Sequence, residues 1–529
     1  MTKYMNILKS VAVVATLFAV VSCETIETDL TEDPNQLTAN DANIEFLFNS
    51  NQIALVSFFQ NLQFQEATVS RMELMRNSPF YASQYDAGSF DGAWIRAYAN
   101  LLNETKQLKV IAAEIETDVV NANNYIAAAQ ILEAYTVVTL VDTFGDIPFS
   151  EALQGSDNFD PGRDSGESVY AQARELLLNA IVKINGTSSV DLASDLYFNG
   201  DMNKWKALAN SLLLKIAVSS RLNNSNAATE ANAVINGADF ISSNSGDFEF
   251  KWSTSAEPES RHPLFQAQYV GGAGTYMSNA MLSRMDGDPR FNYYFYQQDG
   301  ADPFQYPPAG GNGFEGRAHG DAGPSVASDY PLITVHGLYP AGGKYNDGTT
   351  GATSGTMGAA GAGISPIMTH AFTQFLLAEA QLTLNNNAGA ARNALIAGVT
   401  ASMDKVTGFQ GGANGADNEP TAGEIQAYID SVGTAFDAAS NPSGKLNVII
   451  SEYYKAAWGN GVEVYNNFRR TSFPADMAPS IAPNPGTFTN SMLYPSNYIN
   501  NNNNTDAVQK SSVGVKVWWA EGTSFNLDF

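Results

Sequence analysis

Few side chains in this sequence have the types and spacing that bond-breaking chemistry requires. Of the four histidines, no two occur at the spacing that places a pair of imidazoles around zinc; they are His262, His319, His336 and His370. Cys23 is the only cysteine, so neither a thiolate metal site nor a cysteine nucleophile can form in the body of the chain. No G-x-S-x-G segment marks a hydrolase serine, and no glycine-rich run ends in the G-K-[ST] of a phosphate-binding loop. The sequence therefore contains no motif for catalysis.

Acidic residues are abundant but do not define a site. A glycosidase needs two carboxylates roughly 5–10 Å apart that come from distant positions in the chain, so the 54 acids leave this alternative open. Asp86 to Asp91 and Asp286-Gly287-Asp288 could hold a structural Ca²⁺, although neither has the spacing of an EF-hand loop. Aspartates in such segments more commonly form turns, and we favour that role. No other cofactor is expected.

Aromatic residues in loop-like segments are the remaining candidates for function. Sugar rings have apolar C–H faces that stack on aromatic planes, and aromatic side chains bring a large contact area with few rotatable bonds. The predicted ligand contacts are Tyr81, Tyr85, Trp94, Trp252, Tyr293, Tyr294, Tyr296 and Tyr306. Each ring alone is better explained by packing, and Trp94 also suits a contact between helices. Two or more of them together are expected to line a ligand surface.

The N-terminal residues 1–22 have the pattern of a lipoprotein signal peptide. Lys3 and Lys9 precede an apolar stretch, Val11–Val21, that is shorter than the ~20 residues of a membrane-spanning helix. Cys23 follows a small residue directly, at the position where lipidation takes place. We therefore predict a lipid anchor on Cys23 and a flexible acidic tether over residues 23–40.

The composition indicates an acidic, folded body. The chain has 529 residues, of which 44% are hydrophobic, and its formal net charge is −26. This charge argues against binding to nucleic acid or to anionic lipid surfaces, because both attract basic residues. It does not select a ligand, since a charged surface also keeps an exported protein in solution.

A helical period of apolar residues recurs in both halves of the chain. Helices are predicted over residues 101–115, 125–141, 168–184, 205–221, 366–384, 388–406, 421–439 and 448–470. Gly145 and Pro148 are expected to end the second of these. The pattern predicts a mainly α fold with a degenerate, tetratricopeptide-like helical-repeat scaffold.

The predicted organisation is a single domain over residues 41–529. Its helical scaffold is expected at about 41–236 and 366–473, and irregular, loop-rich inserts are expected at about 237–365 and 474–529. In the first insert, glycine, proline and aromatic residues replace the helical period. An irregular stretch of this length is usually a functional surface, so we expect it to face the ligand.

Several motifs, in a specific order and spacing, resemble those of the SusD/RagB family of outer-membrane lipoproteins of Bacteroidota. The matching segments cover almost the whole chain: Cys23 with Asp33-Pro34-Asn35, DTFGDIPFSEAL at 142–153, W-x-x-x-A-N-S-L-x-L-K at 205–215, Asp288-Pro289-Arg290, HAFTQFLLAEA at 370–380, GNGVEVYNNFRRTSFP at 459–474, and LYPSNYINNNN with KVWWA within 493–520. The family's aromatic ligand platform has no fixed sequence, so these motifs transfer no binding residue. Trp205 is expected in the core, and Glu463 with Arg469 as a partly buried ion pair.

The resemblance implies four tetratricopeptide-like helix pairs that support a less regular ligand-facing region. It implies a lipid-anchored protein of the outer membrane at the cell surface that captures oligosaccharides, or alternatively oligopeptides, without catalysis. It also implies a partner, a SusC-type TonB-dependent outer-membrane barrel, over which the protein acts as a lid. A glycan-degrading enzyme and a pure protein-interaction scaffold are the less favoured alternatives.

Overall fold

The computed structural model describes most of the chain after the predicted tether. The described residues are 43–74, 86–115, 121–298, 314–321, 323, 331–343, 345, 351–409, 419–483 and 485–522. Ile44–Phe529 forms one compact unit, and the following description concerns that unit. Four residues with a predicted function lie outside the described residues: Cys23, Tyr81, Tyr85 and Tyr306.

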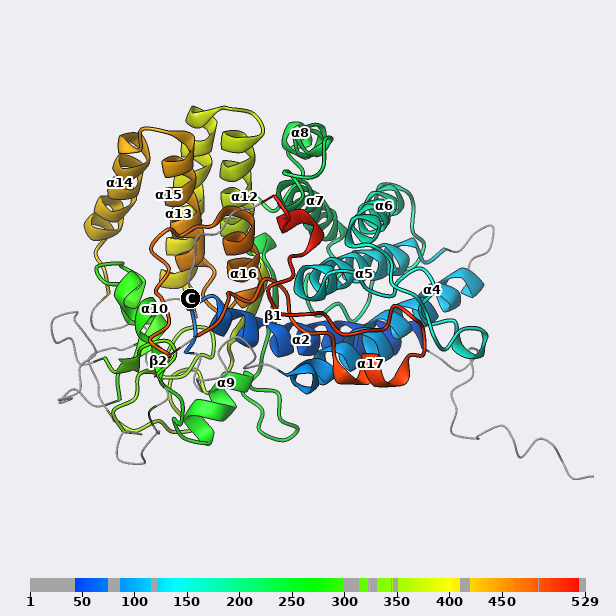
Figure 1. Ribbon diagram of the computed structural model, residues 1–529, viewed down its shortest axis with the longest axis horizontal. Helices are drawn as coiled ribbons and strands as arrows, with labels where there is room; N and C mark the ends of the chain where they lie inside the picture. The colour runs from blue at the N-terminus through cyan, green and yellow to red at the C-terminus, as the bar shows by residue number, and fades with distance from the viewer. Residues whose placement is uncertain are drawn as a thin grey trace, which may run out of the picture. The chain divides into compact units, whose positions relative to one another are not determined.

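Helices dominate the described structure, which confirms the mainly α fold class (Figure 1). The longer helices are α2 (Ile44–Val69), α4 (Asn103–Ile115), α5 (Asn123–Phe144), α6 (Gly166–Asn185), α7 (Met202–Ser219), α8 (Ala227–Gly237), α12 (His370–Thr383), α13 (Ala388–Thr407), α14 (Ala422–Ala438), α15 (Pro442–Ala456) and α16 (Gly461–Thr471). The shorter helical segments are η3 (Ala87–Phe90), α3 (Asp91–Ile95), the π-helical η4 (Arg96–Leu102), η5 (Gly155–Asp157), η6 (Asn244–Gly246), α9 (Pro263–Phe265), η7 (Gln266–Val270), α10 (Asn279–Arg284), α11 (Phe291–Tyr294), α17 (Ser496–Asn501) and η10 (Trp518–Ala520).

The helix predicted over residues 366–384 is wrong at its start. Residues Ile364–Met368 form strand β6, and α12 begins after it. Thr369 caps α12, because its side-chain oxygen accepts a hydrogen bond from the N–H of Phe372 at 3.3 Å. A threonine cap and the preceding proline outweigh the apolar period at this point.

The single helix predicted over residues 448–470 is also wrong, because this stretch contains two helices. α15 ends at Ala456 and α16 begins at Gly461. Asn460 caps α16 by accepting a hydrogen bond from the N–H of Glu463 at 3.1 Å. The long helix α2 and the shorter α8 were not predicted.

Consecutive helices pack side by side as pairs. α5 packs on α6, α7 on α8, α12 on α13, and α14 on α15 (Figure 1). α12 also contacts α7, so the two groups of helices adjoin although the first insert separates them in sequence. This pairing of neighbouring helices is typical of helical-repeat scaffolds.

α5 is strongly apolar and buried on most of its surface. Among the described helices it alone has the length and apolarity of a membrane-spanning segment, and 89% of its most apolar window is buried inside the protein. A helix that is apolar on all sides lies in a core or in a membrane, and α5 contacts α4, α6, α7 and α2. It ends at Gly145, as predicted, with a φ of +85° that favours glycine.

α16 lies deep in the scaffold, against α2. Its residues Gly461–Arg470 are all buried. Gly461 approaches α2 so closely that a Cβ atom there would lie 2.0 Å from the carbonyl oxygen of Gln63. A larger residue at this position would therefore force the two helices apart.

The ion pair predicted between Glu463 and Arg469 is wrong. Glu463 instead forms a buried ion pair with Lys215 of α7. Arg469 donates a hydrogen bond to the carbonyl oxygen of Asn490 at 2.8 Å. Trp205 is fully buried, as expected.

The first insert contains short strands that form three two-stranded sheets. The pairs are β1 (Phe248–Lys251) antiparallel to β6 (Ile364–Met368), β2 (Met277–Ser278) parallel to β4 (Gly316–Arg317), and β3 (Phe295–Tyr296) antiparallel to β5 (Val335–His336). In the first sheet Phe248 lies opposite Met368. Met368 directly precedes Thr369, the residue that caps α12. The pair β1–β6 thus connects the two ends of the insert next to the scaffold.

Candidate functional site

A pocket lined by aromatic and amide side chains lies between three segments that are distant in sequence. We call it the Trp94 pocket; its volume is about 310 Å³, which is in the range of small-molecule sites. α3 and η4 form one side, the loop 148–161 a second side, and α17 with the residue after it a third. Its aromatic and amide lining residues are Trp94, Tyr98, Phe159, Tyr498, Asn158, Asn497, Asn501 and Asn502.

Three of these rings form a row in the pocket. The ring centroid of Trp94 lies 4.6 Å from that of Tyr98 and 5.1 Å from that of Tyr498, with an interplanar angle of 35° in each case. The edge of Phe144 in α5 packs against Trp94 at 5.5 Å. Trp94 is only 7% exposed and Tyr498 only 6%. The scaffold therefore holds the rings in place from behind.

Asp91 of α3 attaches α17 to this row of rings. Its carboxylate accepts a hydrogen bond from the Ser496 hydroxyl at 2.6 Å and one from the Asn497 N–H at 2.8 Å. A carboxylate is favourable there, because the start of a helix has unpaired N–H groups and a partial positive charge. Asp86 caps η3 in the same way, accepting from the N–H of Ser89 at 2.9 Å. Both aspartates thus have local structural roles.

The hydroxyls of the two pocket tyrosines differ in their partners. The Tyr98 hydroxyl donates a hydrogen bond to the carbonyl oxygen of Pro148 at 2.7 Å. The Tyr498 hydroxyl is shielded from solvent and has no hydrogen-bond partner among the described residues. Leaving a shielded polar group unpaired costs about 1–3 kcal/mol. Because the Tyr498 ring lines the pocket, a small shift of this side chain on ligand binding would let a ligand acceptor remove that cost.

Both hydroxyls keep their protons at neutral pH. Burial raises the pKa of Tyr498 to about 12. Burial also raises the pKa of Tyr98 well above that of free tyrosine, and the nearby Tyr498 and Tyr494 add to the increase. The Tyr498 hydroxyl therefore remains a neutral donor.

Three of the predicted ligand contacts pack inside the insert instead. Tyr293 is 3% exposed, while Tyr294 and Tyr296 are fully buried. Tyr294 stacks on Trp458 with centroids 5.4 Å apart, and Tyr296 lies 6.3 Å from Tyr269. Because these three rings are buried and do not line the Trp94 pocket, we assign them to packing.

Trp252 lines a separate pocket of about 440 Å³. Its indole Nε1 donates a hydrogen bond to the Ser365 hydroxyl at 2.8 Å. The wall of this pocket includes Lys405 and Glu249, which form an ion pair at 2.5 Å. The structure thus keeps Trp252 apart from the Trp94 pocket, and of the described ligand candidates only Trp94 lines the aromatic row.

Two larger hollows have different linings. One, of about 890 Å³, is bordered by acidic residues that include Asp286, Asp288 and Glu424. Asp288 forms an ion pair with Arg290 at 2.7 Å, which accounts for its position in the turn. No group of three or more His, Cys, Asp or Glu side chains is placed to hold a metal ion within the part of the chain that the structure describes.

The other hollow, of about 640 Å³, lies between α6, α7 and α8. Its rings Tyr170 and Trp518 meet edge to face at 5.1 Å, so they do not form a stacked row. An ion pair between Arg174 and Glu230 at 3.2 Å occupies part of its wall. The Trp94 pocket is therefore the better candidate for a stacking ligand.

Sequence analysis missed three rings of the pocket: Tyr98, Phe159 and Tyr498. Tyr98 follows Trp94 by four residues, a spacing that places both on one side of a helix, so it could have been identified. Phe159 and Tyr498 lie in polar segments without a period, and only the folded chain brings them to Trp94.

Comparisons with known proteins agree with this architecture. A SusD-like family, described as starch-binding and associating with the outer membrane, matches residues 34–495. No curated protein matches the sequence.

Solved structures cover the chain almost completely. A chitin-binding protein is 19% identical and covers 90% of this chain and 100% of its own, with a TM-score of 0.70. A SusD homologue from Bacteroides fragilis is 20% identical over 90% of this chain and 99% of its own, with a TM-score of 0.69. A chitin-binding SusD homologue from Flavobacterium johnsoniae is 20% identical over 91% and 99%, with a TM-score of 0.66. On the family match and the shared fold, this chain belongs to the SusD/RagB family.

Proposed function

We propose that the protein is a cell-surface lipoprotein of the outer membrane that captures oligosaccharides in the Trp94 pocket. The observation that carries the proposal is the row of Trp94, Tyr98 and Tyr498 rings in the pocket, with a Tyr498 hydroxyl that has no hydrogen-bond partner among the described residues. The description of the family as starch-binding, and the two chitin-binding proteins of the same fold, support a glycan as the ligand.

The pocket combines the two kinds of contact that a sugar needs. Tyr98, which is only partly buried, supplies apolar ring surface for the C–H face of a pyranose ring, and Trp94 and Tyr498, which also line the pocket, support it from behind. The Tyr498 hydroxyl and the side chains of Asn497 and Asn501 supply polar groups for sugar hydroxyls. Nothing in this combination requires a bond in the ligand to break.

Calorimetry with residues 24–529 tests the proposal, using chitohexaose and maltoheptaose as glycan probes and a mixture of oligopeptides as the alternative. Tyr498→Phe should weaken glycan binding about five- to tenfold, because it removes one buried hydrogen bond. The same change should leave the free energy of unfolding unchanged or raise it by up to ~1 kcal/mol, since the free protein loses an unpaired shielded group.

Tyr494→Phe is the matched control. The Tyr494 ring lies 5.8 Å from that of Tyr498, but its hydroxyl already donates to the carbonyl oxygen of Asp146 at 2.8 Å. This variant should lose about 1 kcal/mol of stability and retain glycan affinity. Binding of oligopeptides without any binding of glycans would contradict the sugar assignment.

We also propose that Cys23 carries the lipid anchor and that the partner is a SusC-type TonB-dependent barrel. Cys23→Ser should release the protein from the membrane fraction and abolish labelling by a palmitate analogue. Affinity purification of the anchored protein should recover the barrel. Recovery of other proteins without a barrel would favour the scaffold alternative.

Turnover distinguishes the proposal from a glycan-degrading enzyme. Incubation of the probes with the purified protein should leave their chain length unchanged by mass spectrometry. Release of shorter products, lost on replacement of one Asp or Glu, would contradict a role in binding alone.

A further inference from the structure

The asparagine-rich run near the C-terminus holds one wall of the Trp94 pocket. Asn502 donates from Nδ2 to the carbonyl oxygen of Pro161 at 2.9 Å, and Asn504 donates from Nδ2 to the carbonyl oxygen of Asp160 at 3.1 Å. The carboxylate of Asp160 accepts from the backbone N–H of Asn503 at 2.7 Å and from its Nδ2 at 3.1 Å. We call this set of hydrogen bonds the Asn clamp.

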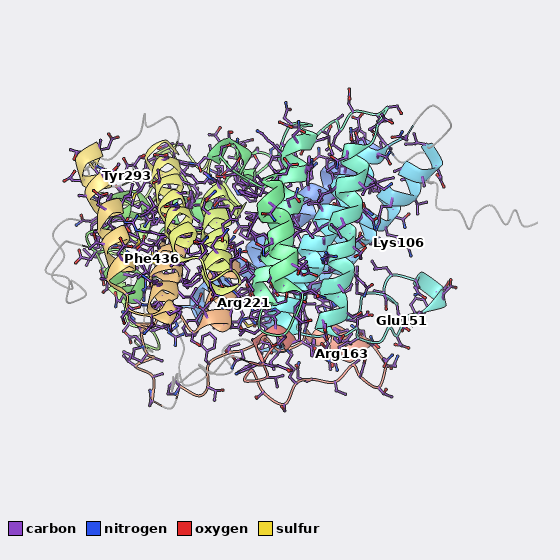
Figure 2. The ribbon with its side chains drawn as sticks, turned by 90° about the horizontal axis from the view of Figure 1, so that it is seen from above. Lys106, Glu151, Arg163, Arg221, Tyr293 and Phe436 are labelled. Carbon is purple, nitrogen blue, oxygen red and sulfur yellow. The ribbon has the colours of Figure 1, made fainter. Side chains whose placement is uncertain are left out.

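A second contact continues the clamp beyond Pro161. The N–H of Arg163 donates to the carboxylate of Asp506 at 2.7 Å, and the Arg163 guanidinium lies 4.6 Å from the ring centroid of Tyr494. Figure 2 labels Glu151 and Arg163, which lie toward the two ends of the clamped loop. From the other side, Lys106 donates to the carbonyl oxygen of Leu153 at 2.5 Å. The loop is thus fixed to α4 on one side and to the C-terminal segment on the other.

Phe159 lies in the middle of this fixed loop and lines the pocket. Its side chain is 76% exposed. A single exposed phenylalanine is ordinary on a protein surface. Here, however, the backbone on both sides is held, because the N–H of Asp160 also donates to the side-chain oxygen of Asn158 at 3.0 Å. The exposed ring therefore has a defined place at the edge of the pocket.

We propose that Phe159 is a ligand contact and that Asp160 is a positioning residue. Asp160, as part of the Asn clamp, holds the loop that carries the Phe159 ring and thereby affects ligand affinity. This inference rests on the proposed function, in that it assigns an additional ring and its support to the same pocket. Asp160 does not line the pocket, whereas Phe159 does. Loss of the clamp should therefore matter only while the Phe159 ring is present.

A double-mutant cycle tests this dependence with chitohexaose and maltoheptaose in calorimetry. Phe159→Ala should weaken binding about tenfold through loss of a stacking ring, and Asp160→Ala about fivefold through loss of its fixed position. The double variant should bind about as weakly as Phe159→Ala, not roughly fiftyfold more weakly than the wild type. Asp160→Asn, which keeps a side-chain acceptor, should restore part of the affinity.

Asp157→Ala is the matched control, since it removes an equal charge from the same loop at a residue outside the pocket lining. It should leave affinity unchanged. Hydrogen exchange provides a readout without ligand: the amides of residues 155–163 should exchange at least about tenfold faster in Asp160→Ala and not in Asp157→Ala.

The outcomes separate this inference from the proposed function. Glycan binding with additive losses in the cycle, or unchanged exchange in Asp160→Ala, would overturn the inference and leave the proposed function intact. Failure of the wild type to bind either glycan would overturn the proposed function and the ligand role of Phe159 together.

Discussion

The protein contains two aromatic clusters that differ in their access to a hollow. The insert cluster consists of Tyr294, Tyr296 and Tyr269 with Trp458, and its rings are buried. The pocket rings are the row of Trp94, Tyr98 and Tyr498 together with Phe159, and they line a hollow. In Figure 2, Tyr293 of the insert and Arg163 next to the pocket lie well apart, which agrees with two separate regions. Aromatic crowding thus indicates packing or binding equally well, and access to a hollow decides between them.

Trp458→Ala should have the largest effect, and it concerns the insert cluster alone. The Trp458 ring is 1% exposed and stacks on Tyr294 and on His336, at 5.4 and 4.8 Å. Its removal should cost about 3–5 kcal/mol of unfolding free energy, because a large cavity remains. Chemical denaturation measures this loss. Glycan affinity at a temperature where the variant stays folded should not change, and a selective loss of affinity would contradict the distinction between the clusters.

Glu66→Gln should have the next largest effect on stability. It tests whether a buried polar atom that lacks a partner is by itself a sign of ligand binding. Glu66 is a buried residue of α2 that lines none of the pockets described above. One of its oxygens accepts a hydrogen bond from the Thr143 hydroxyl at 2.7 Å, and the other has no partner within the described part of the chain. Burial raises its pKa to about 7, although Arg469, the Thr143 hydrogen bond and Lys215 act in the opposite direction.

The sign of the resulting pH dependence follows from this raised pKa. Below about pH 4.5 Glu66 is neutral in the folded and the unfolded chain. Between about 4.5 and 7 only the unfolded chain releases the proton, so the contribution of Glu66 to stability falls as pH rises and then levels off. The unfolding free energy of Glu66→Gln, relative to that of the wild type, should therefore increase by roughly 2–3 kcal/mol from pH 4 to pH 8. Chemical denaturation at both pH values measures this difference. The same difference in unfolding free energy between variant and wild type at both pH values would contradict the raised pKa. Glycan binding by the variant should be unaffected.

Tyr296→Phe should have the smallest effect and is the direct counterpart of Tyr498→Phe. The Tyr296 hydroxyl donates to the carbonyl oxygen of Gly351 at 3.4 Å, a long hydrogen bond. Its removal should change stability by less than ~0.5 kcal/mol and leave glycan affinity unaltered, as thermal melts and calorimetry would show. A loss of affinity as large as that expected for Tyr498→Phe would place the ligand at the insert cluster instead.

The scaffold was largely predictable, because apolar periodicity and caps are local properties. Helices α4 to α7 and α12 to α14 lie close to their predicted positions. Two boundary errors occurred where a local cap overrode the period, at Thr369 and Asn460, and the helices α2 and α8 were missed. The partner of Glu463 was not predictable, because Lys215 lies on another helix that only packing brings close.

The sequence by itself determined the family, the mainly helical fold, and Trp94 as a candidate ring. It also predicts a lipidation site at Cys23, since a signal pattern lies in consecutive residues of the chain. The tertiary structure alone decided which rings line a hollow, because Trp94, Phe159 and Tyr498 come from segments far apart in the chain. It also decided that the asparagine-rich run forms the Asn clamp, since the partners of these amide side chains are backbone and carboxylate groups of a distant loop that only folding brings close.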